Sequence, residues 1–225
     1  MSNSSRVGAT RSIDWSLYLV TDPYLGGGRQ KVVGVVQRAL TGGVGVVQLR
    51  DKEGSDAQVE ETARELLAIL GDVPLFIDDR VEVAAKLGCH LHIGQNDMPL
   101  AQARAALGPE QLIGLSVGSD ADLDALDGLA AASPHLLPDV VGIGPVFNTA
   151  TKLDAPDGLG VKEARRLATR ASSRGIPAVA IGGINAESVS SLAGSDFFGV
   201  CVVSAIMAAQ DPKAAAHTLK EKFNG

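Results

Sequence analysis

A glutamine and two cations occupy alternate positions near residue 50. Gln48, Arg50 and Lys52 lie in the run VVQLRDKEG, at the end of a β-branched segment. Side chains two apart on a strand share one face, so we expect these three to point the same way. Two positive charges on one face can bind an anion. The alternative is a solvated strand end whose cations pair with Asp51 and Glu53.

Three carboxylates stand at the ends of two further apolar runs. Asp78 and Asp79 lie in FIDDR, and Asp97 lies in HIGQNDMP. Carboxylate oxygens are hard ligands, and Mg²⁺ is usually held by one or two of them together with substrate phosphate. The carboxylates therefore predict a magnesium site. The competing interpretation is that Asp79 pairs with Arg80 and that Asp97 caps a helix beginning near Pro99.

The segment GPVFNTATKLDAPDG, residues 144–158, has no apolar periodicity and is rich in polar side chains. Thr149 and Thr151 are two apart, so both hydroxyls can reach one phosphate if the segment is extended. The neighbours of Lys152 are threonine and aspartate. This polar setting favours a charged anion clamp over a Schiff-base lysine, which needs a desolvated site. Glycine and proline near both ends favour a loop that closes as a lid.

The elements that must position these residues are eight short apolar runs. They cover residues 17–20, 45–49, 75–77, 89–93, 112–116, 140–143, 178–183 and 197–203. Most are followed by a stretch of helical period, clearest over 55–70 and 161–172. A last helix begins at Asp211-Pro212, an N-cap residue followed by proline. Eight such alternations predict an α/β fold, a single (β/α)8 TIM barrel over residues 14–225.

An open doubly wound sheet is the competing architecture. It usually carries G-x-G-x-x-G after the first strand, and the run TDPYLGGGRQ does not fit that motif. In a barrel, active sites lie at the carboxyl ends of the strands, and the loops after strands seven and eight bind phosphate. Gly182, Gly183 and Ser204 follow those two strands, so we expect a phosphate site there.

His90 and His92 form an H-x-H pair of the kind that binds metal ions in some barrels. The remaining histidines are His135, after AAASP, and His217, in the last helix. Neither supplies the missing ligands of such a site. We therefore expect core packing or hydrogen bonding for at least one member of the pair.

The composition limits the classes of partner. A net charge of -6 and a pI near 5.2 argue against a broad nucleic-acid surface. Residues 1–13 are polar, lack the apolar segment of a signal peptide and predict a disordered lead-in, and no apolar run approaches membrane-spanning length. Cys89 and Cys201 lie in apolar runs and predict buried thiols, which indicates a cytoplasmic protein. The composition is compatible with either a monomer or a homo-oligomer.

Taken together and in order, the motifs resemble the thiamine phosphate synthase family. The matching runs are LYLVTD, VVQLRDK, DDR, HIGQNDMP, IGLSV, GIGPVFNTATKLDA, AIGGI and VVSAIM. Q-x-R-x-K, G-Q-x-D-M-P and T-x-T-K in this order form a specific combination. The resemblance implies a Mg²⁺-dependent transferase that joins a hydroxymethylpyrimidine diphosphate to a thiazole phosphate, giving thiamine phosphate and pyrophosphate by dissociative substitution.

The resemblance also implies a role for each polar residue. Mg²⁺ is held by Asp79 and Asp97. The residues implied in catalysis are Arg50, Lys52, Lys152 and Ser116. Those implied in substrate binding are Gln48, Arg50, Lys52, Asp78, Ser116, Thr149, Thr151, Lys152, Gly183, Val203 and Ser204, and the last three lie with the two threonines around the thiazole phosphate.

Asp78 departs from the family pattern, which usually has asparagine at this position. An extra carboxylate then faces the diphosphate and should repel it unless it is protonated or metal-bound. Two other functions are therefore left open. One is a thiazole-phosphate isomerase on the same barrel, which needs neither a diphosphate clamp nor a metal pair. The other is a non-catalytic thiamine- or phosphate-binding regulator.

Overall fold

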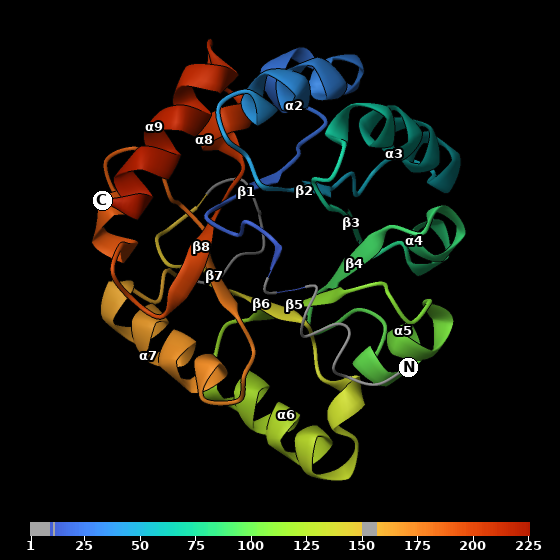
Figure 1. Cartoon of the computed structure of the whole chain (residues 1–225), viewed down its shortest axis with the longest axis vertical. Helices are drawn as coiled ribbons and strands as arrows, with labels where there is room; N and C mark the ends of the chain where they lie inside the picture. Colours follow the sequence, from blue (N-terminus) through green and yellow to red (C-terminus); the bar gives the residue numbers. More distant parts are fainter. Residues whose placement is uncertain (1–9, 11, 150–156) are drawn as a thin grey trace.

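Eight parallel strands close into a barrel at the centre of the molecule (Figure 1). The computed structural model describes residues 10, 12–149 and 157–225. Neighbouring strands follow the order of the sequence, and the eighth pairs with the first. The strands are β1 Leu17–Val20, β2 Val46–Leu49, β3 Leu75–Asp78, β4 His90–Ile93, β5 Ile113–Val117, β6 Val140–Ile143, β7 Ala178–Ile181 and β8 Phe197–Val202. The predicted (β/α)8 barrel is confirmed.

Helices form a ring outside the barrel, and α9 packs against α2 to complete it (Figure 1). The α-helices are α2 Val32–Leu40, α3 Asp56–Leu70, α4 Val81–Leu87, α5 Leu100–Ala106, α6 Asp120–Ala132, α7 Val161–Ser172, α8 Ser204–Met207 and α9 Pro212–Asn224. The 3-10 helices are η1 Leu25–Gly27, η2 Arg29–Lys31, η3 Pro134–Leu136 and η4 Val189–Leu192. Between β7 and β8 the ring is formed by η4 in place of an α-helix.

The predicted helix starts agree with the observed caps. Ser55 caps α3 through a capping box with Gln58, which explains why the helix begins one residue after the predicted start. Asp211 caps α9, accepting hydrogen bonds from the backbone of Lys213 and Ala214. Both caps satisfy backbone N–H groups that have no partner inside the helix.

The apolar core has two parts, on either side of the strands. The larger part lies between the barrel and the helices. The smaller part fills the lower barrel, where the rings of Trp15, Tyr18 and Phe76 lie 5.7 to 6.1 Å apart. Tilted aromatic pairs of this kind add about 0.5–1.5 kcal/mol each beyond their buried area. This apolar plug closes the barrel below its mouth.

A buried ion pair joins α5 to the beginnings of β5 and β6. Arg104 Nη2 lies 2.6 Å from Asp139 Oδ2, and both side chains are less than a tenth exposed. Arg104 also donates to the carbonyl of Gln111 at 2.8 Å, while Asp139 accepts from the backbone of Ile113 at 2.8 Å. The pair is therefore desolvated and hydrogen-bonded on both sides.

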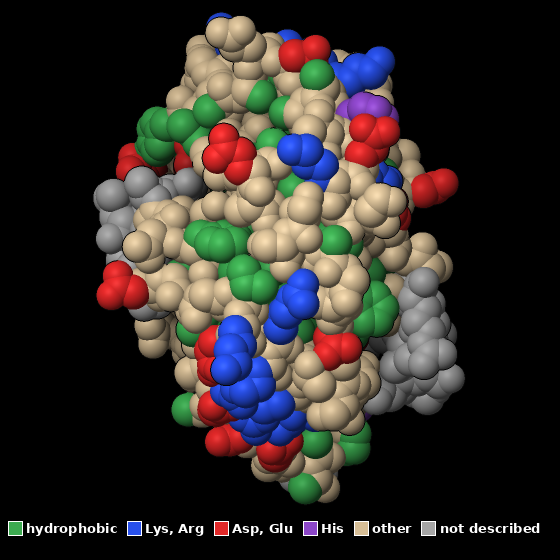
Figure 2. Space-filling model, turned by 90° about the vertical axis from the view of Figure 1, so that its left-hand side faces the viewer, with side chains coloured by type: hydrophobic (Ala, Val, Ile, Leu, Met, Phe, Trp, Pro, Cys, Tyr) green, Lys and Arg blue, Asp and Glu red, His purple; other side chains and the backbone are tan. Residues whose placement is uncertain are grey.

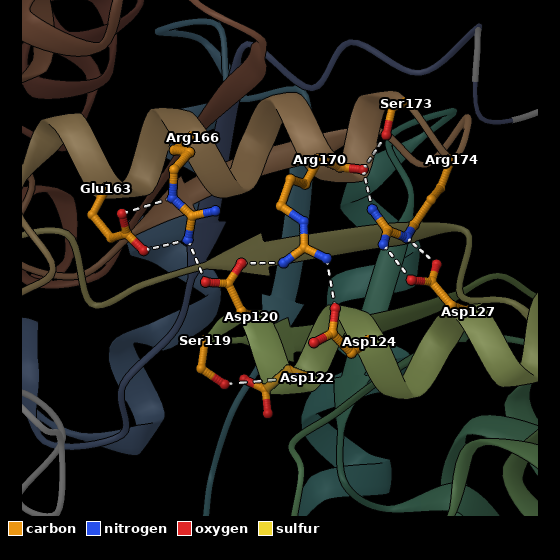
Figure 3. Close-up of polar contacts among 10 residues, drawn as sticks. All are labelled: Ser119, Asp120, Asp122, Asp124, Asp127, Glu163, Arg166, Arg170, Ser173 and Arg174. Carbon is orange, nitrogen blue, oxygen red and sulfur yellow. Dashed lines mark hydrogen bonds and ion pairs between the residues drawn. The ribbon is translucent and has the colours of Figure 1, made fainter.

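A ladder of exposed ion pairs joins α6 to α7 (Figure 3). Arg166 contacts Asp120 at 2.5 Å, and Arg174 contacts Asp127 at 2.6 Å. Arg170 lies between them and reaches both Asp120 and Asp124. The hydrogen bond from Arg166 holds the pKa of Asp120 below its usual value. The ladder therefore joins the α-helix before β6 to the α-helix after it.

The surface and the thiols agree with the limits set by composition. Figure 2 shows basic side chains gathered beside acidic ones at the lower edge of one face, so positive charge there is not isolated. Cys89 and Cys201 are free and buried, as predicted. Thr10, inside the predicted lead-in, is buried and accepts a hydrogen bond from Trp15 Nε1. Across the described part of the chain, no helix is long and apolar enough to cross a membrane.

We predict that Arg104→Ala lowers the free energy of unfolding by about 3–5 kcal/mol, because it leaves the Asp139 carboxylate buried without its cation. Urea unfolding at neutral pH measures the change. Lys86→Ala, which breaks the exposed pair with Glu60, is the matched control and should cost much less. Equal losses in the two variants would contradict the assignment.

Candidate active site

A cavity of about 230 Å³ opens among the carboxyl ends of the strands. Every predicted site residue that the structure describes lines it. These residues are Gln48, Arg50, Lys52, Asp78, Asp79, Asp97, Ser116, Thr149, Gly183, Val203 and Ser204. Thr151 and Lys152 lie outside the described residues. The barrel therefore gathers side chains that are spread over more than 150 positions of the sequence.

Cations and carboxylates contact one another at the carboxyl ends of β2 and β3. Lys52 Nζ lies 3.1 Å from Asp78 Oδ2 and also pairs with Asp79. Arg50 Nε lies 3.7 Å from the same oxygen of Asp78. Burial lowers the pKa of Lys52 and the two carboxylates raise it, and the net result is a pKa above its usual value. Lys52 is therefore a fixed positive charge in the cavity.

The alternative pairing within the strand end is wrong. Asp51 turns to the other side and pairs with Arg29 at 2.6 Å. Glu53 accepts a hydrogen bond from the hydroxyl of Tyr24. Alternation along the chain explains this result, because it directs Arg50 and Lys52 to the cavity and Asp51 away from it.

Asp79 is held in an unusual backbone conformation and a crowded electrostatic environment. Its φ of 59° lies in the left-handed region, which aspartate tolerates better than most residues. Burial, the charge of Asp78 and a hydrogen bond with Asp97 raise the pKa of Asp79 to about 6. The carboxylates thus crowd enough negative charge together that one proton is retained well above the ordinary range.

The structural alternatives for the two predicted metal ligands are also wrong. Arg80 turns to Asp56, at 2.6 Å, and does not pair with Asp79. Asp97 Oδ2 accepts from the backbone N–H of Gly94 at 2.6 Å, and within the described residues α5 begins after Pro99 without a side-chain cap. Both carboxylates are thus directed to the cavity mouth.

The described residues do not form a complete metal cage. No group of three or more His, Cys, Asp or Glu side chains among them is arranged to hold a metal ion. Two carboxylates are nevertheless the usual protein contribution to a Mg²⁺ site that is completed by substrate phosphate and water. Asp79 and Asp97 are two carboxylates that line the same cavity.

Close backbone packing explains the two glycines on the other side of the cavity. The loop after β6 crosses the end of β7, where Val146 donates to the carbonyl of Ile181 and Phe147 to that of Gly182. Gly182 and Gly183 have φ values of 99° and 66°. A Cβ on Gly183 would lie 2.6 Å from the carbonyl oxygen of Asn148. Any larger residue would therefore separate the two loops.

The described residues on either side of 150–156 are tied to one another. Asn148 Oδ1 accepts from the backbone of Gly158 at 2.8 Å, and the backbone of Gly160 donates to the carbonyl of Val146 at 2.9 Å. Thr149 lines the cavity directly after this anchor. The predicted lid motion concerns residues that lie partly outside the described ones, and it stays a prediction.

The structure separates the two histidines that the sequence pattern groups together. His90 packs on Phe76 with ring centroids 5.0 Å apart and accepts from the backbone of Leu112 at 3.0 Å. Burial lowers its pKa to about 4, so it is a neutral core residue. His92 instead lines the cavity, and its Nε2 lies 3.0 Å from Ser116 Oγ.

Sequence reasoning missed His92 as a cavity residue, although the sequence contained a signal for it. His92 is paired in register with Asp78 on the neighbouring strand. Both residues stand two positions beyond an interior residue, Phe76 or His90. Alternation therefore places the imidazole at the same height as the predicted carboxylate.

The family model described as thiamine monophosphate synthase matches residues 17–206. The chain belongs to this family. A solved structure of thiamine phosphate pyrophosphorylase from Pyrococcus furiosus superposes with a TM-score of 0.77 at 31% identity, covering 94% of this chain and 98% of the other. The two structures therefore share the same fold over nearly the whole chain.

Curated relatives of the thiamine monophosphate synthase family are similar over most of the chain. Thiamine-phosphate synthase from Azorhizobium caulinodans is 43% identical, with 92% of this chain and 94% of the relative covered. Thiamine biosynthesis multifunctional protein ThiED from Corynebacterium efficiens is 48% identical over 92% of this chain. The match spans 28% of the length of that multifunctional relative.

We predict that Asp79→Asn stabilises the ligand-free protein at neutral pH. Because the folded state raises the pKa of Asp79 from 3.8 to about 6, it binds this proton more tightly than the unfolded chain does. Stability therefore declines as pH rises between those values, and the asparagine variant lacks this decline. Asparagine also tolerates the left-handed backbone.

Melting temperatures without divalent ions test this expectation. The variant should exceed the wild type at about pH 7.5 and approach it at about pH 4.5. Asp72→Asn, on an exposed residue outside the cavity, is the control. A difference between Asp79→Asn and wild type that does not depend on pH would rule out the raised pKa.

Proposed function

We propose that this chain is a thiamine phosphate synthase, joining a hydroxymethylpyrimidine diphosphate to a thiazole phosphate. The main support is that one cavity has cationic side chains at one end and the glycine-containing loop after β7 at another. Arg50 and Lys52 line it beside the carboxylates of Asp79 and Asp97, and Gly183 lies at the end of β7, several strands away. Two phosphorylated substrates that react with each other need this arrangement.

The diphosphate end can stabilise a leaving group. In the proposed reaction the bond between the methylene carbon and the diphosphate oxygen breaks, and its electron pair leaves with pyrophosphate. Arg50 and Lys52 hold positive charge where the negative charge develops. The electron-rich aminopyrimidine supports the cation on the methylene carbon until the thiazole nitrogen forms the new C–N bond. A protein nucleophile is not required.

Asp79 and Asp97 are the residues that we propose to hold Mg²⁺. The observation that supports the fit is the raised pKa of Asp79, because crowded carboxylates that retain a proton favour a divalent cation in its place. When bound, the ion neutralises charge on the diphosphate. The assignment therefore predicts that the ion and the diphosphate bind together.

Asp78, which stands where the family usually has asparagine, has a proposed role in this cavity. The sequence suggests that this carboxylate repels the diphosphate. In the structure it pairs with both Lys52 and Arg50, so its charge is balanced inside the cavity. We propose that Asp78 holds the two cations in place before the substrate arrives.

The phosphate of the thiazole is proposed to bind at the other end of the cavity. Gly183 lines this end after β7, where barrels of this kind bind phosphate, and Thr149 and Ser204 add hydroxyl groups. Val203 lies beside them. The proposed roles of Thr151 and Lys152 extend this site from residues outside the described part of the chain.

The alternatives make different demands on the cavity. A thiazole-phosphate isomerase needs no diphosphate clamp, so the grouping of Arg50 and Lys52 with Asp79 and Asp97 speaks against it. A non-catalytic regulator would bind ligands without turnover. The free, buried thiols agree with the proposed cytoplasmic location.

Turnover by the purified protein tests the proposal. Both substrates are mixed with the protein and Mg²⁺, and thiamine phosphate and pyrophosphate are measured together. We expect the two products in equal amounts. Thiazole-phosphate binding without product at any divalent metal would leave the regulator, and isomerised thiazole without pyrophosphate would leave the isomerase.

We predict that Asp97→Ala reduces turnover by about 100-fold or more while thiazole phosphate still binds, because the carboxylate lies at the metal end of the cavity. Steady-state rates and calorimetric binding measure the two effects. Asp72→Ala, outside the cavity, is the control and should keep wild-type turnover. Unchanged turnover in Asp97→Ala would remove this residue from the metal site.

A further inference from the structure

We propose that His92 is a positioning residue for Ser116. Its Nε2–H donates to Ser116 Oγ, so that the serine hydroxyl proton is free to be donated to an acceptor atom of the pyrimidine. This inference rests on the proposed function for the identity of the ligand. The hydrogen-bond direction itself depends on geometry inside the free protein.

The two side chains meet at the floor of the cavity. His92 Nε2 lies 3.0 Å from Ser116 Oγ, and both residues line the cavity. The carbonyl of Ser116 accepts from Gln95 Nε2 at 2.6 Å, which fixes the serine backbone. Among the described residues, the imidazole of His92 is therefore the group that orients the hydroxyl.

The second nitrogen of His92 lies in an apolar setting. Nδ1 is buried and has no hydrogen-bond partner among the described residues. A Cβ built on Gly114 would lie 2.5 Å from Nδ1, so this nitrogen faces the α-carbon of Gly114 and not the cavity. Gly142, where a Cβ would lie 3.6 Å from Cε1, leaves room on the next strand.

This geometry selects one tautomer. A neutral imidazole has one N–H donor and one acceptor nitrogen. Because Nδ1 is buried without an acceptor among the described residues, a proton on both nitrogens would leave one N–H without a partner, and the neutral ring is favoured. A buried N–H without a partner is rarer in folded proteins than an acceptor without one. The proton therefore belongs on Nε2, where Ser116 accepts it.

The direction of this hydrogen bond decides what Ser116 offers to a ligand. A hydroxyl has one donor hydrogen and two acceptor lone pairs. With one lone pair occupied by His92, its hydrogen is directed elsewhere, and the cavity is the open side. Ser116 then favours a ring-nitrogen acceptor over an amino donor, which gives the cavity a means to orient an aminopyrimidine.

Two substitutions at His92 separate positioning from packing. Glutamine can place its Nε2 amide where imidazole Nε2 lies, whereas leucine fills similar space without a donor. We expect His92→Leu to lower kcat/KM for the pyrimidine diphosphate by about 10-fold and His92→Gln to recover most of it. Thiazole-phosphate binding should not change. His90→Leu and His90→Gln, on the core histidine of the same strand, are matched controls.

A double-mutant cycle and a direct measurement complete the test. Ser116→Ala should cost much less in the His92→Leu background than in the wild type, because His92 acts through that hydroxyl. Nitrogen-15 NMR of the ligand-free wild type should show the Nε2–H tautomer. The Nδ1–H tautomer, or equal losses for leucine and glutamine with additive effects of Ser116→Ala, would overturn the proposal.

The NMR result keeps the two proposals distinguishable. If the wild type neither binds the pyrimidine diphosphate nor turns it over, the proposed function fails, and the tautomer still decides whether His92 donates to Ser116. If turnover is normal and the tautomer is Nδ1–H, the positioning role fails and the synthase remains.

Discussion

Alternation of side chains in a closed parallel barrel is the constraint on which the rest of this structure depends. Every second residue of each strand points inward, and closure brings all eight inward faces together. In the lower barrel those positions hold Tyr18 and Phe76, and Trp15, which precedes β1, packs against both. Two residues further along, at the mouth, they hold polar side chains such as Asp78 and His92. One periodic rule therefore builds both an apolar plug and a reactive surface above it.

Charge balance at the mouth follows from the same geometry. Lys52 and Arg50 extend from the end of one strand towards Asp78 on the next, so the two cations are held in position by an internal counter-ion. Burial, together with the neighbouring carboxylates of Asp78 and Asp97, raises the pKa of Asp79.

The supporting interactions lie away from this cavity. The Arg104–Asp139 pair joins α5 to β5 and β6, and the ion-pair ladder joins α6 to α7. Neither contributes to the cavity lining. These stabilising pairs and the residues that line the cavity are therefore different residues.

The sequence by itself determined the barrel, its eight strands and the set of polar residues at their ends, because apolar runs, caps and strand alternation are local properties of the chain. It did not distinguish His90 from His92, since both stand at inward positions of one strand and differ only in what faces them. Nor could it show that Asp78 is neutralised by Lys52. The tertiary structure decided both points, because pairing partners and desolvation depend on which strands and loops the closed barrel brings into contact.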